Sequence, residues 1–174
     1  ESFSLGNANL QRIEYKIKGD TTSEEKEMYS WKKAAQLYAD YFYGIKNPKQ
    51  LKKESKAIDK LIKQNGFELL KTDRDKIVAL ESFMKDNFQI KNGARAFFVH
   101  QIVKAKSYTE LSANRMFVLL LKALEIDHQI LLTCSRYDKV FDGDFESYSF
   151  LENYLIYFPK YDQYAVPSYE LFRY

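Results

Sequence analysis

The sequence predicts an α+β fold in which helices pack on a small antiparallel sheet. Hydrophobic residues recur at helical spacing from Trp31 to Leu124, and from Gln129 onward they alternate at strand spacing instead. A succession of helices followed by antiparallel strands is typical of the α+β class. A chain of 174 residues is also long enough to bury a sizeable core.

The first predicted element is a strand at Leu10–Lys18. Its apolar side chains lie on one face and its charged side chains on the other, the period of a half-buried strand. We expect residues 1–21 to be a strand and linker, and residues 22–174 to form the main domain. Because the chain opens with Glu1 rather than methionine, we also expect it to be a piece of a longer protein.

Four helices follow on local signals. They are predicted from Thr22 to about Gly44, from Gln50 to Gln64, from Thr72 through Phe88, and from Ser107 to Leu124. A Ser or Thr followed three residues later by an acidic residue begins three of them and has the pattern of a capping box, which satisfies the free N–H groups of a first turn. Trp31 is expected to pack within the first helix, on a stripe with Ala34, Ala35 and Tyr38.

The last of these helices is predicted to be the centre of the fold. Its run from Met116 to Leu121 contains no polar residue, and a helix that is apolar all round packs on several sides. We expect Ser107 and Glu110 to form its capping box.

The remaining chain is predicted to form strands at 129–133, 152–158 and 161–166, the last two joined by a hairpin across Pro159-Lys160. A polar, aromatic loop, Tyr137–Ser149, connects the first two of these strands. The lysine-rich segment Lys49–Gln64 has apolar residues at helical spacing, so its charges are interpreted as a solvated helix face and not as a nucleic-acid site.

Two segments, LLKALEI (Leu120–Ile126) and LENYLIYFPKYDQYAVPS (Leu151–Ser168), resemble the transglutaminase-like superfamily, which has a papain-like cysteine hydrolase fold. In that family a cysteine begins the buried helix about sixteen residues before the isoleucine, and the following strands carry Asn-His and Asp-Pro-Thr. In this register the catalytic positions read Glu110, Asn153 and Val166. None of these residues supplies the family's nucleophile, base or orienting carboxylate.

The resemblance therefore implies a catalytically inactive domain, acting as a binding or scaffolding module in a larger bacterial protein. It further implies an extracytoplasmic location, a preceding β-sandwich, and flanking domains of the same polypeptide as partners. We expect a peptide or a glycan as ligand, because aromatic rings offer apolar faces with polar tips. The candidate contact residues are Tyr108, Tyr137, Phe141, Phe145 and Tyr148.

Two other functions stay open, a hydrolase or transferase with catalytic residues foreign to the family, and a structural spacer between domains. Cys134 is the single thiol, and about 3.3 Å per strand residue would separate it from His128 by roughly 20 Å. His100 lies in an apolar segment and is interpreted as a core residue.

No zinc spacing exists, and Asp138, Asp142, Asp144 and Glu146 lack the spacing of an EF-hand, so we predict no metal and no cofactor. No stretch is long enough to span a membrane.

Overall fold

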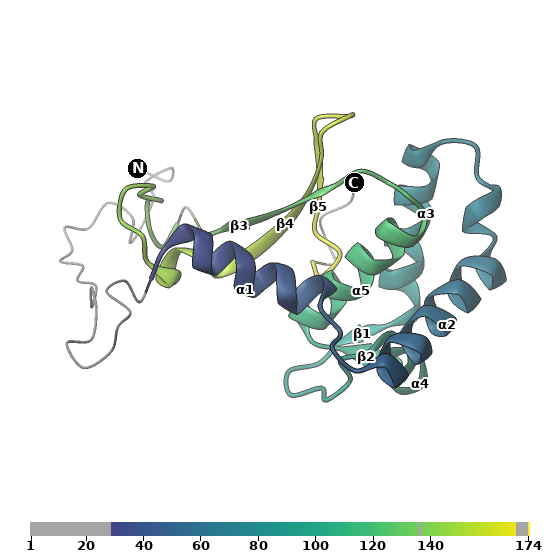
Figure 1. Ribbon diagram of the computed structural model, residues 1–174. Coiled ribbons are helices and arrows are strands. Elements are labelled where there is room, and N and C mark those ends of the chain that lie inside the picture. Colours follow the sequence, from purple (N-terminus) through teal and green to yellow (C-terminus); the bar gives the residue numbers. More distant parts are fainter. Residues whose placement is uncertain (1–28, 136, 170–173) are drawn as a thin grey trace. The chain divides into compact units, whose positions relative to one another are not determined.

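The computed structural model describes residues 29–135, 137–169 and 174, and the chain divides into two compact units (Figure 1). Among the described residues, one unit combines residues 29–41 with 131–135 and 137–155, and the other combines residues 42–130 with 156–169 and 174. We call them the aromatic unit and the helical unit. The five α-helices and two small sheets of the described residues confirm the predicted α+β class. The predicted strand at 10–18, the boundary after residue 21 and the capping box at Thr22 lie outside the described residues.

The helical unit contains four α-helices, α2 (Pro48–Asn65), α3 (Asp73–Asn87), α4 (Val99–Ala105) and α5 (Glu110–Ala123). Short-range contacts set their ends. The Asn47 side chain accepts the N–H groups of Lys49 and Gln50 at 2.9 and 3.3 Å, and Gly66 ends α2 at a φ of 66° that favours glycine. The Thr72 hydroxyl accepts the Asp75 N–H at 3.1 Å, which confirms the predicted start of α3.

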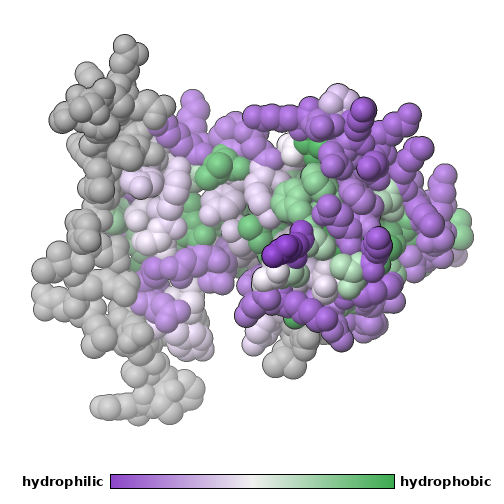
Figure 2. Space-filling view, turned by 90° about the horizontal axis from the view of Figure 1, so that it is seen from below, coloured by the Kyte–Doolittle hydropathy of each residue, from purple (hydrophilic) through white to green (hydrophobic). Residues whose placement is uncertain are grey.

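Helix α5 is the centre of this unit, as predicted. Every residue from Ser112 to Leu121 is buried, and the helix packs against α2 and α3 (Figure 1). On α3, the apolar residues Ile77, Leu80 and Met84 are fully buried as well. Figure 2 shows the molecule from below the view of Figure 1. On this face, hydrophilic residues cover most of the helical unit, with smaller hydrophobic areas between them.

The predicted N-cap of α5, Ser107, is wrong by two residues. Ser107 and Tyr108 remain extended as β2, which pairs in parallel with β1 (Gln89–Ile90), so Ser107 is not a cap. Thr109 is the N-cap instead, and its partner in the capping box is Ser112. The Thr109 hydroxyl accepts the Ser112 N–H at 3.2 Å, and the Ser112 hydroxyl accepts the Thr109 N–H at 2.9 Å.

The second sheet has the order β3 (Gln129–Thr133), β4 (Asn153–Phe158), β5 (Gln163–Ala165). Strands β4 and β5 pair antiparallel, with Ile156 opposite Ala165, and the turn between them begins at Pro159. The predicted hairpin is therefore confirmed. Two 3₁₀ turns, η2 (Phe67–Leu69) and η3 (Tyr148–Phe150), complete the described elements.

The aromatic unit contains most of α1 (Trp31–Tyr43) and the loop that connects β3 to β4. Helix α1 begins at Trp31, because Ser30 accepts the Ala34 N–H on its carbonyl and the Lys33 N–H on its hydroxyl. Tyr29 and Ser30 are not helical, so α1 is not continuous with the predicted start at Thr22.

Candidate functional site

Glu110, the residue that the resemblance aligns with the family's cysteine, is the first residue of α5. Its side chain is exposed, and its Oε1 is 3.4 Å from the Ser168 hydroxyl. The Asn114 amide donates to the Glu110 carbonyl at 3.1 Å and to the Ser168 hydroxyl at 3.3 Å. The segment Val166–Ser168 therefore meets the N-terminus of α5 through Ser168. A carboxylate at a helix N-terminus is stabilised by the helix dipole.

The other two predicted positions lie on or beside the second sheet. Asn153 is the first residue of β4 and Val166 follows β5 directly, and both are partly buried. Glu110 and Val166 belong to the helical unit, whereas Asn153 belongs to the aromatic unit. The convergence of all three on one site remains a prediction.

Replacing Glu110 with glutamine is expected to lower the free energy of unfolding by about 1 kcal/mol or less. The substitution removes a favourable charge at an exposed helix N-terminus and keeps the hydrogen-bonding shape of the side chain. Thr109 supplies the cap in either variant. Chemical denaturation of both proteins measures the difference. A loss of several kcal/mol would contradict a simple dipole contact.

The aromatic loop, residues 137–149, carries four of the five predicted ligand contacts. Tyr137 and Phe141 are exposed by 65% and 48%, and the neighbouring Val140 by 66%. The Phe145 ring contacts Phe150 edge-on at 6.4 Å, and the Tyr148 ring contacts Tyr29 edge-on at 5.0 Å. Two of the predicted rings thus face solvent, and two pack within their own unit.

Trp31 fixes the aromatic loop to the first turn of α1. Its indole Nε1 donates to the Gly143 carbonyl at 2.7 Å, and its backbone N–H donates to the Glu146 carboxylate at 2.9 Å. The Phe141 ring stacks on the indole with centroids 5.6 Å apart and contacts Phe150 edge-on at 5.5 Å. The exposed Phe141 ring is therefore held on a preformed support.

Tyr108 corrects the predicted set of ligand contacts. Only 1% of this residue is exposed, its hydroxyl donates to the Met84 carbonyl at 3.2 Å, and its ring stacks on Phe88. The side chain is a core residue of the helical unit and is closed to a ligand. The prediction placed Tyr108 in the first turn of the helix that begins at Ser107, whereas the residue lies on the buried strand β2.

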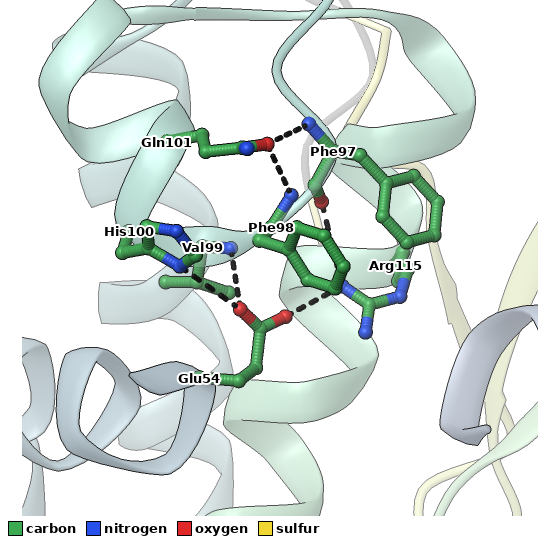
Figure 3. A network of polar contacts seen from close by, with 7 residues as sticks. All are labelled: Glu54, Phe97, Phe98, Val99, His100, Gln101 and Arg115. Atoms are coloured by element: carbon green, nitrogen blue, oxygen red, sulfur yellow. Dashed lines mark hydrogen bonds and ion pairs between the residues drawn. The ribbon is translucent and has the colours of Figure 1, made fainter. Parts of the chain in front are cut away.

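A buried polar network, which the sequence patterns did not predict, connects α2, α4 and α5 (Figure 3). Arg115 and Glu54 are both buried, with guanidinium NH1 2.6 Å from Glu54 Oε1. The other carboxylate oxygen accepts the Val99 N–H at 2.9 Å and lies 3.7 Å from His100 Nδ1. The guanidinium also lies over the Phe97 ring, 4.5 Å from its centroid.

The other candidate nucleophile and base, Cys134 and His128, are held by contacts with nearby residues. Cys134 is partly buried, with its sulfur 3.8 Å from the Lys139 carbonyl. His128 Nδ1 donates to the Ile126 carbonyl at 2.8 Å, and its Nε2 is hydrogen-bonded to the Tyr43 hydroxyl at 3.1 Å. Burial raises the pKa of Tyr43, which keeps this hydroxyl protonated. Both nitrogens of His128 are thus engaged.

Two of the four acidic residues of the aromatic loop, Asp142 and Glu146, accept hydrogen bonds from backbone N–H groups of the aromatic unit. The Asp142 carboxylate accepts the N–H groups of Asp144 and Phe145, at 2.9 and 3.3 Å, and Glu146 accepts from Trp31. Within residues 29–135, 137–169 and 174, no group of three or more His, Cys, Asp or Glu side chains is arranged to hold a metal ion. None of the helices in the same ranges has the length and apolar character to cross a membrane.

No protein-family model, curated protein or solved structure matches this chain.

Proposed function

We propose that this chain is a non-catalytic binding module of the transglutaminase-like kind, and that its aromatic loop binds a peptide carrying apolar and basic side chains. One observation carries the proposal. Phe141 is 48% exposed, yet its ring is held between Trp31 and Phe150. An exposed ring on a rigid support loses little conformational freedom on binding, as an interface anchor requires.

Charge favours a basic peptide over a neutral glycan. The aromatic loop contains four acidic residues and one lysine, for a net charge of −3. The lysine, Lys139, is 2.6 Å from the Glu152 carboxylate and 2.6 Å from the Ser149 carbonyl, so it is already paired. Tyr137, Val140 and Phe141 supply the exposed apolar contacts between these acids. Complementary charge adds selectivity and speeds association.

The family resemblance supports the non-catalytic part of the proposal. The positions of the family's triad read Glu110, Asn153 and Val166, so the covalent route through a thiolate is not available at them. A module of this kind would act together with flanking domains of its polypeptide, and an extracytoplasmic location belongs to the same proposal.

Replacing Phe141 with alanine is expected to weaken peptide binding about 10- to 30-fold, because truncating an anchor ring costs about 2 kcal/mol. The probe is a fluorescent peptide of alternating leucine and lysine, measured by anisotropy. The matched control is Leu69→Ala, which truncates an 80% exposed side chain in the helical unit and should change nothing. A peptide with glutamate in place of lysine should bind much more weakly.

Three outcomes would contradict the proposal. Equal binding of the lysine and glutamate peptides would remove the role of charge, and preferential binding of a chitin oligosaccharide would favour a glycan ligand. Turnover of an acyl ester by the unmodified protein would favour the hydrolase or transferase hypothesis.

A structural spacer is the second candidate, and the ring contacts of Phe145 and Tyr148 favour it. These rings fill space within the aromatic unit, as they would in a module whose aromatic residues only stabilise the fold. A spacer predicts that Phe141→Ala lowers stability and changes no peptide or glycan affinity. The anisotropy and denaturation measurements together separate the two candidates.

A further inference from the structure

A small cavity lies between α2 and α4 of the helical unit. Its volume is about 230 Å³, and it is lined by Ala57, Lys60, Leu61, Gln64, His100 and Val103. Pockets for drug-sized ligands hold roughly 300–1,000 Å³, so an occupant of this cavity has few heavy atoms. Apolar side chains from both helices are combined with three polar groups, which is the composition of a site for an amphipathic small molecule.

His100 connects this cavity to the buried network of Figure 3. Its Nδ1 is buried, has no hydrogen-bond partner and faces Glu54 Oε2 at 3.7 Å, while the side chain as a whole is 31% exposed. Because a carboxylate only accepts hydrogen bonds, the proton on this side of the ring belongs on Nδ1. The other nitrogen, Nε2, then presents a lone pair in the neutral ring and an N–H in the protonated ring.

The charges around the ring favour an anionic occupant once the ring is protonated. Glu54 and Arg115 form a pair with no net charge, so a protonated His100 adds one uncompensated positive charge to the network. Lys60 adds a second at the cavity, and Lys104 follows His100 by one turn of α4. No carboxylate among the described residues lines the cavity.

We propose that this cavity binds a small monocarboxylate with a short aliphatic chain. The carboxylate is held by the Lys60 ammonium, the His100 Nε2–H and the Gln64 amide, and the aliphatic chain contacts Leu61 and Val103. Binding favours the protonated imidazole, because the bound anion balances the added positive charge. This site lies in the helical unit and does not rest on the peptide surface of the aromatic loop.

The two histidines of the chain provide the test. The ring signals of His100 and His128 are followed by NMR while sodium butyrate is added to the full chain, and a His100→Gln variant assigns them. We expect a saturable shift of the His100 signals, with both ring nitrogens moving toward imidazolium values. His128 is the internal control, because Ile126 and Tyr43 already engage its two nitrogens. Butyramide, a neutral molecule of similar shape, should leave His100 unchanged.

Substitutions on α2 test the role of charge. Lys60→Met should weaken butyrate binding about tenfold, the loss expected for one charged hydrogen bond. Lys52→Met removes an exposed lysine of the same helix that does not line the cavity, and should have no effect. A linear, non-saturating shift, an equal response to butyramide, or an equal loss in both variants would overturn the proposal. Tighter binding of inorganic phosphate than of butyrate would overturn the choice of a monocarboxylate.

Discussion

Replacing Arg115 with methionine is expected to lower the free energy of unfolding of the helical unit by about 3–5 kcal/mol. Arg115 is fully buried, and its guanidinium lies 2.6 Å from a carboxylate oxygen of Glu54, which is itself only 1% exposed. Removing the cation leaves a buried negative charge with the Val99 N–H as its main remaining donor. Desolvation of the unpaired carboxylate is the dominant cost.

The other contributions of Arg115 are smaller. Its guanidinium lies over the rings of Phe97 and Phe98, 4.5 and 5.7 Å from their centroids. A desolvated cation–π contact is worth about 2 kcal/mol at most. Methionine keeps much of the side-chain volume, so the variant loses little further stability through an empty cavity. A loss near the upper end of the range would therefore reflect both the unpaired, buried charge of Glu54 and the lost ring contacts of Arg115.

A double-mutant cycle separates the charge effect from the packing effect. Glu54→Gln in the Arg115→Met background removes the orphaned charge, so the double variant should be more stable than Arg115→Met alone. Denaturation of the four proteins gives the coupling energy between the two sites. If Arg115→Met alone lowered the free energy of unfolding by less than about 1 kcal/mol, the Glu54 carboxylate would have another partner in the variant. This explanation of the network would then be wrong.

The helix boundaries that the sequence predicted well are those set by contacts within a few residues. Thr72 caps α3 through an N–H three residues away, and Gly66 ends α2 with its own backbone conformation. The start of α5 depended on a contact that is distant in sequence, since β2 pairs with β1 and keeps Ser107 extended. Helix α4 was not predicted because only seven residues form it, too few for a helical period to be visible.

The buried network was missed although its signal was present. Glu54 shares a helical stripe with Ile58, Leu61 and Ile62, so an acidic residue occurs on the apolar face of α2. Arg115 directly precedes the apolar run of α5 and is equally buried. Two opposite charges on apolar faces predict a buried pair when they are considered together. The interpretation of Lys49–Gln64 as a solvated helix face included Glu54, and Arg115 was not considered.

Replacing Trp31 with alanine is expected to destabilise the aromatic unit by about 2–3 kcal/mol. Truncating a fully buried tryptophan costs about 3–5 kcal/mol, and Trp31 is only partly buried, so its loss falls below that range. The variant loses the stack on Phe141 and the hydrogen bond to Gly143, but its backbone N–H still reaches Glu146. Trp31 is the single tryptophan of the chain, so the alanine variant has no tryptophan fluorescence. Its unfolding is therefore followed by circular dichroism.

Trp31→Phe is the matched control, since it keeps an aromatic ring for Phe141 and removes only the indole donor. Its expected loss is about 1 kcal/mol, because the exposed Gly143 carbonyl can accept a hydrogen bond from water instead. Amide hydrogen exchange at Asp144 and Phe145, whose N–H groups donate to Asp142, reports whether the aromatic loop has loosened. We expect faster exchange in Trp31→Ala and near-normal exchange in Trp31→Phe. Unchanged exchange in the alanine variant would show that the loop holds its shape without Trp31, and the preformed support assigned to Phe141 would have to come from Phe150 alone.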